Sequence, residues 1–108
     1  MMKRRITFDT PTEVLSFVRA CLDDLDVDRL YGAAQEATSE FWRERIFDDL
    51  REIDESDSLE AVFGATDGFP EGVSEYTMGG HSDRTRHLHF DLVRSKGSWQ
   101  LNKIWRCR

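Results

Sequence analysis

The sequence has few of the residues that mark several common protein classes. Only two cysteines, Cys21 and Cys107, occur among 108 residues, so neither a disulfide framework nor a paired Cys-x-x-Cys zinc motif can form. No apolar run approaches the roughly 18 residues of a membrane span, and the basic N-terminus lacks the apolar core of a signal peptide. We therefore expect a cytoplasmic protein with reduced thiols and no membrane partner.

Motifs for common cofactors are missing as well. The sequence contains no GxGxxG, no P-loop and no GxSxG, and the acidic tract of residues 54–60 lacks the turn glycine of a calcium loop. We therefore expect no bound cofactor. Acids outnumber bases 21 to 15, and the bases are scattered rather than striped, which argues against a nucleic-acid partner.

The charge that is present divides unevenly along the chain. Residues 6–78 hold 19 acids and 5 bases, a net charge of −14, whereas residues 79–108 hold two acids and seven bases, a net charge of +5. Asymmetry of this kind can mark a partner surface. A simpler interpretation is an acidic helical layer beside a basic terminal hairpin.

Helical signals fill the first half of the chain. Thr10 is placed to cap a helix that has Pro11 in its first turn and Glu13 in a capping box. Its apolar face comprises Val14, Phe17, Val18, Cys21, Leu22 and Leu25. Asp26 or Asp28 is expected to cap a short second helix, and Thr38 or Ser39 a third. The face of the third helix comprises Trp42, Ile46, Leu50 and Ile53, widened by Phe41 and Phe47.

After Ser58 the apolar period changes from three or four residues to two, which predicts strands. We expect a short strand over 59–63 and longer strands over 73–78, 86–94 and 99–107, the last two joined by a turn over 95–98. Helices that precede an antiparallel sheet predict a single α+β domain over residues 1–108.

The register of the terminal hairpin follows from its turn. If Lys96 and Gly97 are the two turn residues, Leu92 faces Leu101 and Arg94 faces Trp99. The same register sets Phe90 opposite Lys103, Leu88 opposite Trp105, Asp91 opposite Asn102, His89 opposite Ile104 and His87 opposite Arg106. One face of the hairpin is then apolar except for Lys103, and the other is mixed and polar.

Both ends of the chain resemble the nuclear-transport-factor-2-like superfamily. Thr10-Pro11-Thr12-Glu13 is similar to the start of its first helix, and Gly97-Ser98-Trp99-Gln100-Leu101 is similar to the Gly-x-Trp-x-Leu signature of its last hairpin. The resemblance implies a cystatin-like cone, in which N-terminal helices cover a curved antiparallel sheet and enclose a pocket. It also implies a homodimer through the outer sheet face. The short segment of residues 59–72 departs from the long central strands of that superfamily.

The inner face of such a cone suggests where a ligand would bind. The pocket candidates are Tyr31, Trp42, Tyr76, Phe90, Lys103 and Trp105. Lys103 is the one inward base, which would meet an anionic ligand; the alternative is a lysine whose stem covers apolar surface while its ammonium reaches water.

The outer face carries a possible metal site. His87, His89 and Asp91 alternate along one strand, which sets neighbours on the same side about 6.6 Å apart and suits a divalent transition metal. In the predicted register Arg106 would repel a cation there, so we expect no resident metal and a polar face instead. That face supplies the candidates for the dimer interface: His87, His89, Asp91, Asn102 and Ile104.

Two functions remain open. The first is a non-catalytic, homodimeric module that binds a small ligand or a partner. The alternative is a small-molecule lyase, isomerase or cyclase of the ketosteroid-isomerase or polyketide-cyclase type, which the resemblance implies. No inward carboxylate or imidazole is predicted to serve as the acid or base of such an enzyme.

Overall fold

Helices occupy the first part of the described chain and strands the second. The computed structural model describes residues 6–107, so Lys3, Arg4 and Arg5 of the basic N-terminus lie outside the described residues. The elements are α1 (Pro11–Asp23), α2 (Val27–Gly32), α3 (Glu40–Ser56), α4 (Leu59–Phe63), β1 (Glu75–Gly79), β2 (Leu88–Ser95) and β3 (Ser98–Arg106). The strands form an antiparallel sheet in the order β1-β2-β3. The predicted α+β class is confirmed.

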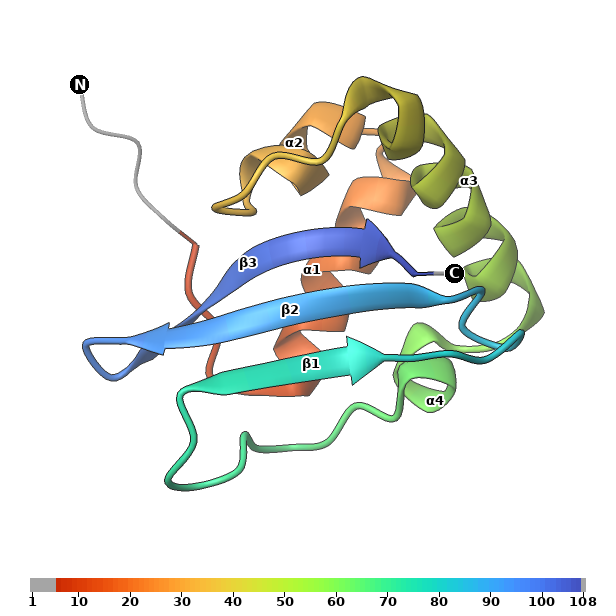
Figure 1. The fold of residues 1–108 in the computed structure, drawn as a ribbon. Coiled ribbons are helices and arrows are strands. Elements are labelled where there is room, and N and C mark those ends of the chain that lie inside the picture. Colours follow the sequence, from red (N-terminus) through yellow and green to blue (C-terminus); the bar gives the residue numbers. More distant parts are fainter. Residues whose placement is uncertain (1–5, 108) are drawn as a thin grey trace.

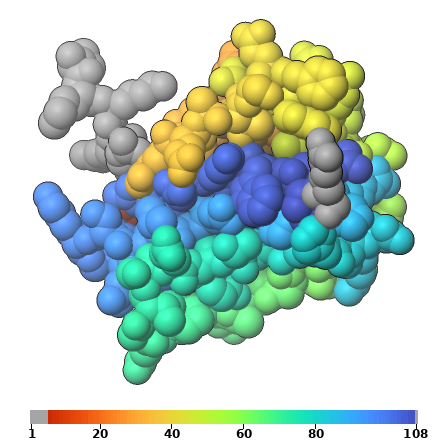
Figure 2. Space-filling model, in the orientation of Figure 1, coloured from red at the N-terminus to blue at the C-terminus, as the bar shows by residue number. Residues whose placement is uncertain are grey.

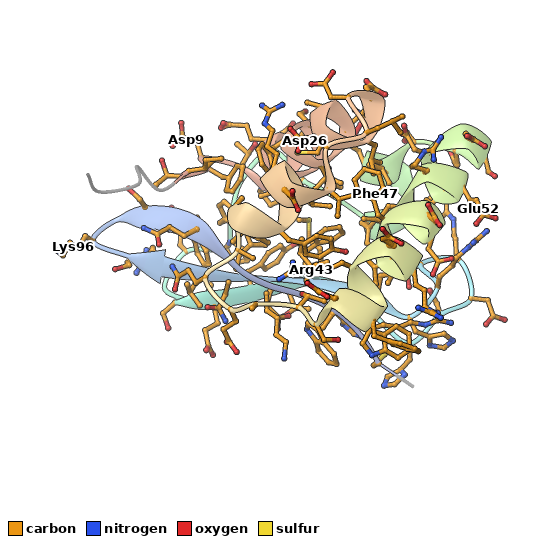
Figure 3. The ribbon with its side chains drawn as sticks, turned by 90° about the horizontal axis from the view of Figure 1, so that it is seen from above. Asp9, Asp26, Arg43, Phe47, Glu52 and Lys96 are labelled. Carbon is orange, nitrogen blue, oxygen red and sulfur yellow. The ribbon has the colours of Figure 1, made fainter. Side chains whose placement is uncertain are left out.

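The helices pack on one face of this sheet. In Figure 1, α1 lies behind the strands, and no described helix covers the face that is turned to the viewer. Figure 3 shows Phe47 on the inner side of α3 and Glu52 on its outer side. The core joins the helices to the inner sheet face, where Phe90, Leu101 and Ile104 are fully buried. Burial of this apolar layer is the main stabilising contribution to the fold.

The first two helices begin where the sequence predicts. The Thr10 hydroxyl accepts the Glu13 backbone N–H at 3.1 Å, and Pro11 occupies the first turn of α1. The Asp26 carboxylate accepts the Arg29 backbone N–H at 3.0 Å and caps α2. Each cap satisfies an N–H group that the helix itself leaves without a partner.

One strand prediction is wrong, and the predicted apolar face of the third helix is wrong in part. Residues 59–63 form helix α4 rather than a strand, because Ser58 caps the Ala61 N–H at 3.1 Å and Gly64 ends the turn in a left-handed conformation. In α3 the buried face comprises Ile46, Phe47, Leu50 and Ile53. Phe41 and Trp42 instead remain 59% and 40% exposed at the start of α3.

The terminal hairpin begins as predicted and then changes register. Lys96 and Gly97 both have positive φ, as a two-residue turn of type I′ requires, and Arg94 pairs with Trp99. After Leu92 pairs with Leu101, a β-bulge shifts the pairing by one residue. Residues beyond the bulge therefore exchange faces with those of the predicted register.

Because of the bulge, every predicted pair beyond it is wrong by one residue. Asp91 pairs with Lys103, Phe90 with Ile104, His89 with Trp105 and Leu88 with Arg106. Lys103 and Trp105 therefore lie on the outer face and Ile104 is buried on the inner one, opposite to the prediction. Asn102 has no partner on β2 because it is the extra residue.

The α2–α3 connection covers the free edge of β3 at the bulge. The backbone N–H groups of Gln35 and Glu36 donate to the carbonyl oxygens of Leu101 and Asn102 at 3.1 and 2.7 Å. The Thr38 hydroxyl donates to the Ile104 carbonyl at 2.6 Å. These bonds satisfy carbonyl groups that would otherwise lie unpaired on an edge strand.

No helix among residues 6–107 has both the length and the apolar character that crossing a bilayer requires.

Substitutions at two adjacent glycines, Gly79 and Gly80, test the close approach of β1 to β2. At Gly79 (φ +95°) a Cβ would lie 2.0 Å from the Leu88 carbonyl oxygen, whereas at Gly80 it would meet open space. We expect Gly79→Ala to lower the free energy of unfolding by at least about 1 kcal/mol, and Gly80→Ala to change it by less than about 0.5 kcal/mol. Urea unfolding of both variants measures this, and equal stabilities would contradict the strand pairing.

Candidate metal centre

Three chain segments meet at one end of the outer sheet face. In Figure 1 the end of β1, the start of β2 and the end of β3 lie at the same end of the sheet, below α3. Figure 2 shows the dark blue end of β3 at the surface, next to the cyan segment that follows β1. The residues that converge here come from the loop of residues 80–87, from β2 and from the position after β3.

Two imidazoles and one thiol form the centre of this site. One donor atom from each of His81, His87 and Cys107 lies within 4.8 Å of the other two. The Cys107 sulfur is 3.3 Å from His81 Nδ1. The Cys107 backbone N–H donates to the His87 carbonyl at 2.9 Å, so the ladder between β2 and β3 continues to this pair. The backbone thus fixes the thiol beside His87.

The loop of residues 80–87 is held by its own hydrogen bonds. The buried Thr85 hydroxyl donates to the Gly80 carbonyl at 2.9 Å, and the Ser82 hydroxyl accepts the Thr85 N–H at 3.2 Å. The His87 N–H donates to the Ser82 carbonyl at 3.1 Å. Arg86 reaches from the loop to Asp49 of α3 at 2.9 Å. These contacts place both loop imidazoles before any ligand binds.

His87 has an uncommon backbone and an unusual ring environment. Arg86 and His87 both have positive φ, 53° and 59°, which is uncommon for residues other than glycine and is often found at functional sites. Asp83 Oδ1 lies 3.6 Å from His87 Nε2. His87 Nδ1 is buried and has no hydrogen-bond partner within residues 6–107. A buried polar atom of this kind needs an explanation, and an ion supplies one.

His89 contacts the thiol from the adjacent strand position. Its Nε2 is 2.8 Å from the Cys107 sulfur, and its ring stacks on Trp105 with centroids 4.2 Å apart. Trp105 Nε1–H in turn donates to Asp91 at 2.8 Å. Burial lowers the pKa of His89, and the neighbouring imidazoles lower it further, against the opposing effect of Asp91. His89 is therefore neutral at neutral pH.

The guanidinium that was predicted to repel a cation lies elsewhere. Arg106 pairs with Leu88, and its side chain reaches Asp49 of α3 at 3.5 Å. The bulge places Cys107 opposite His87 in the position that the predicted register gives to Arg106. A donor for a metal ion thus replaces a repelling charge.

The separation of the Cys107 sulfur and His81 Nδ1 suits a small transition-metal ion. Zinc binds sulfur at about 2.3 Å and nitrogen at about 2.0–2.1 Å, so a tetrahedral site separates these donors by about 3.6 Å. The 3.3 Å between the Cys107 sulfur and His81 Nδ1 is close to this value. Carboxylates commonly accept a hydrogen bond from the second ring nitrogen of a metal-binding histidine; here Asp83 Oδ1 lies 3.6 Å from His87 Nε2, on the ring nitrogen opposite the buried Nδ1.

The pocket candidates do not converge on one cavity. Tyr31 is buried, and its hydroxyl donates a hydrogen bond to the Arg43 carbonyl at 3.0 Å. Burial raises the pKa of this hydroxyl. Phe90 is fully buried, and Tyr76 packs edge-to-face on Phe69. Trp42 is exposed on α3, and Lys103 and Trp105 lie across the sheet. Anion binding by an inward Lys103 therefore loses its structural basis.

The dimer-face candidates also separate. His89 and Asp91 lie on the outer face as predicted, whereas His87 belongs to the loop before β2. Asn102 occupies the bulge, where its side-chain amide donates to Glu36 at 2.8 Å. Ile104 faces the core because the bulge reverses the alternation.

Sequence reasoning missed His81 and Cys107 as partners of His87. His81 lies in a turn-rich segment, where spacing says little about spatial neighbours. Cys107 pairs with His87 only after the one-residue shift of the bulge. One signal in the sequence could have found Cys107. A one-residue shift of the hairpin register places Cys107, a possible metal ligand, opposite His87 in place of the positively charged Arg106.

Comparisons of the chain with protein-family models, with curated proteins and with solved structures gave no match.

Acidification is expected to destabilise the metal-free protein through His89. Its pKa is lowered in the folded state, so the unfolded chain takes up the proton at higher pH. The stabilising contribution is present above about pH 7 and is lost as the pH falls through the folded pKa. Urea unfolding at about pH 7.5 and pH 5.5 with a chelator should show a smaller loss for His89→Gln than for the wild type. His81→Gln, which alters an exposed imidazole, is the control; equal losses in wild type and His89→Gln contradict the assignment.

Proposed function

We propose that the protein is a transition-metal-binding domain whose ligands are His81, His87 and Cys107. The observation that carries the proposal is that one donor atom each from His81, His87 and Cys107 meets the others within 4.8 Å, at a histidine whose buried Nδ1 has no hydrogen-bond partner within residues 6–107. Two further groups lie where outer-shell partners of a metal site are found: Asp83 Oδ1 is 3.6 Å from His87 Nε2, and His89 Nε2 is 2.8 Å from the Cys107 sulfur.

The donor set favours a particular class of metal. Imidazole and thiolate ligands suit zinc and its late first-row neighbours, whereas calcium and magnesium require oxygen ligands. Two imidazoles and one thiolate therefore select zinc, cobalt or copper ions over the hard cations.

Metal binding is separable from folding in this proposal. The core is built from apolar side chains of the helices and the inner sheet face, and the three metal ligands are not among its members. The ion would link the loop of residues 80–87 to the end of β3. It would therefore raise stability by mass action without being required for the fold.

A second candidate function follows from the resemblance to the nuclear-transport-factor-2-like superfamily. Kinship with the nuclear-transport-factor-2-like superfamily and ligand binding in a cone stay predictions, as does the enzymatic alternative. The buried polar residues among 6–107 are Thr38, Thr85 and His89, and His89 is on the outer face. Among these residues the core therefore holds no buried carboxylate that could act as the acid or base of an isomerase or dehydratase.

The homodimer through the outer sheet face also stays a prediction. Ile104, its predicted apolar member, is buried in the core, which leaves Val93 and Trp105 as partly buried apolar side chains on that face. Sedimentation equilibrium tests it. The prediction requires a dimer that Val93→Glu dissociates, and a monomeric wild-type protein contradicts it.

Zinc titration tests the proposed function. Isothermal calorimetry on the chelator-treated protein is expected to show one zinc per chain and no heat of binding with magnesium. Cys107→Ser and His87→Ala each remove a donor, so we expect affinity to fall by more than about 10-fold, the lower bound for loss of an outer-shell partner.

The second cysteine supplies the matched control. Cys21 is buried on α1, away from the site, so Cys21→Ala removes a thiol without removing a ligand. Its zinc affinity should equal that of the wild type. A wild type that binds no zinc, or a Cys107→Ser variant that binds it equally well, overturns the proposal.

A further inference from the structure

We infer that the metal ion in this site keeps one coordination position open to a small anionic ligand. The inference rests on the proposed function and concerns what the bound metal can do. It follows from the number of donors that converge, from the way His89 is held, and from the charge of the assembled site.

The cluster offers three donors where a tetrahedral ion takes four. His81, His87 and Cys107 are the group whose ligand atoms lie within 4.8 Å of one another among the described residues. Metal sites with three protein ligands commonly hold water or substrate in the fourth position, whereas closed four-ligand sites are structural. The exposed position of His81 leaves this side of the site accessible to solvent.

His89 is the obvious alternative for the fourth ligand, and its contacts hold it in another role. Its Nε2 lies 2.8 Å from the Cys107 sulfur, much closer than the about 3.6 Å expected between two donors on one ion. With Cys107 present as a thiolate, Nε2–H donates a hydrogen bond to the sulfur. His89 is thus a positioning residue for the thiolate.

A chain of contacts across the outer face holds the His89 ring in this role. Its ring lies parallel to that of Trp105 within 13°. Trp105 is anchored through Nε1–H to Asp91 Oδ2, and the Thr77 hydroxyl donates to Asp91 Oδ1 at 2.9 Å. Asp91 is therefore also engaged, and it is not free to ligate.

The charge of the assembled site selects the class of the fourth ligand. Counted over the ion and its three ligands alone, a divalent ion with one thiolate and two neutral imidazoles retains a net charge of +1; Asp83, 3.6 Å from His87 Nε2, lies outside this coordination sphere. An anionic donor completes the coordination and neutralises this charge. The open position therefore fits a small anion that binds through one atom, such as a monodentate carboxylate, a thiolate or an inorganic anion.

Cobalt-loaded full-length protein titrated with sodium azide tests this inference. A thiolate-to-cobalt charge-transfer band reports that Cys107 binds the metal, and the visible ligand-field bands report the coordination sphere. We expect azide to change the ligand-field bands saturably, with one azide per cobalt, while the charge-transfer band persists. Ligand-field bands that do not respond to azide overturn the inference.

Variants at His89 distinguish the two roles of its ring. As a positioning residue, His89→Leu should lower cobalt affinity by about 10–100-fold, shift the charge-transfer band to lower energy and keep the azide response. His89→Gln, which can still donate to sulfur, should restore part of the shift. If His89 is instead the fourth ligand, azide leaves the ligand-field bands of the wild type unchanged and alters those of His89→Leu.

The same experiment separates this inference from the proposed function. Absence of the charge-transfer band in the wild type removes the metal site itself and the open position with it. A charge-transfer band without an azide response leaves metal binding in place and rejects the open position alone. Circular dichroism of each variant confirms that the fold is retained.

Discussion

The one-residue bulge at Asn102 determines what each face of the sheet presents. Before it, β2 and β3 pair in the register that the turn at residues 96–97 sets; beyond it, every side chain of β3 changes face. Ile104 completes the apolar core, Trp105 stacks on His89, and Cys107 arrives opposite His87. The core and the candidate metal centre therefore depend on the same local irregularity.

The bulge is itself stabilised from outside the sheet. Adjacent carbonyl groups of Leu101 and Asn102 both point to the free edge of β3, where the N–H groups of Gln35 and Glu36 bind them. The α2–α3 connection thus pairs with two successive residues, which regular strand alternation does not allow. Helical and strand halves of the chain cooperate in placing Cys107, although no residue of the helices belongs to the donor cluster.

Local signals in the sequence predict much of this fold. Thr10 and Asp26 cap their helices because their side chains reach N–H groups three residues ahead, and Lys96-Gly97 forms the turn because both adopt positive φ. The site could not be predicted in the same way. Its geometry depends on a bulge specified by contacts 66 residues apart, such as Asn102 with Glu36, and on left-handed backbone at His87, which strand periodicity does not reveal.

X-ray absorption spectroscopy of the zinc-loaded protein tests the central claim most directly, because it reports which atoms surround the ion. The account predicts one sulfur at about 2.3 Å, from Cys107, together with nitrogen or oxygen neighbours at about 2.0–2.1 Å that include imidazole scattering. A first shell of oxygen and nitrogen alone, with no sulfur, would contradict the assignment of His81, His87 and Cys107 as the metal ligands.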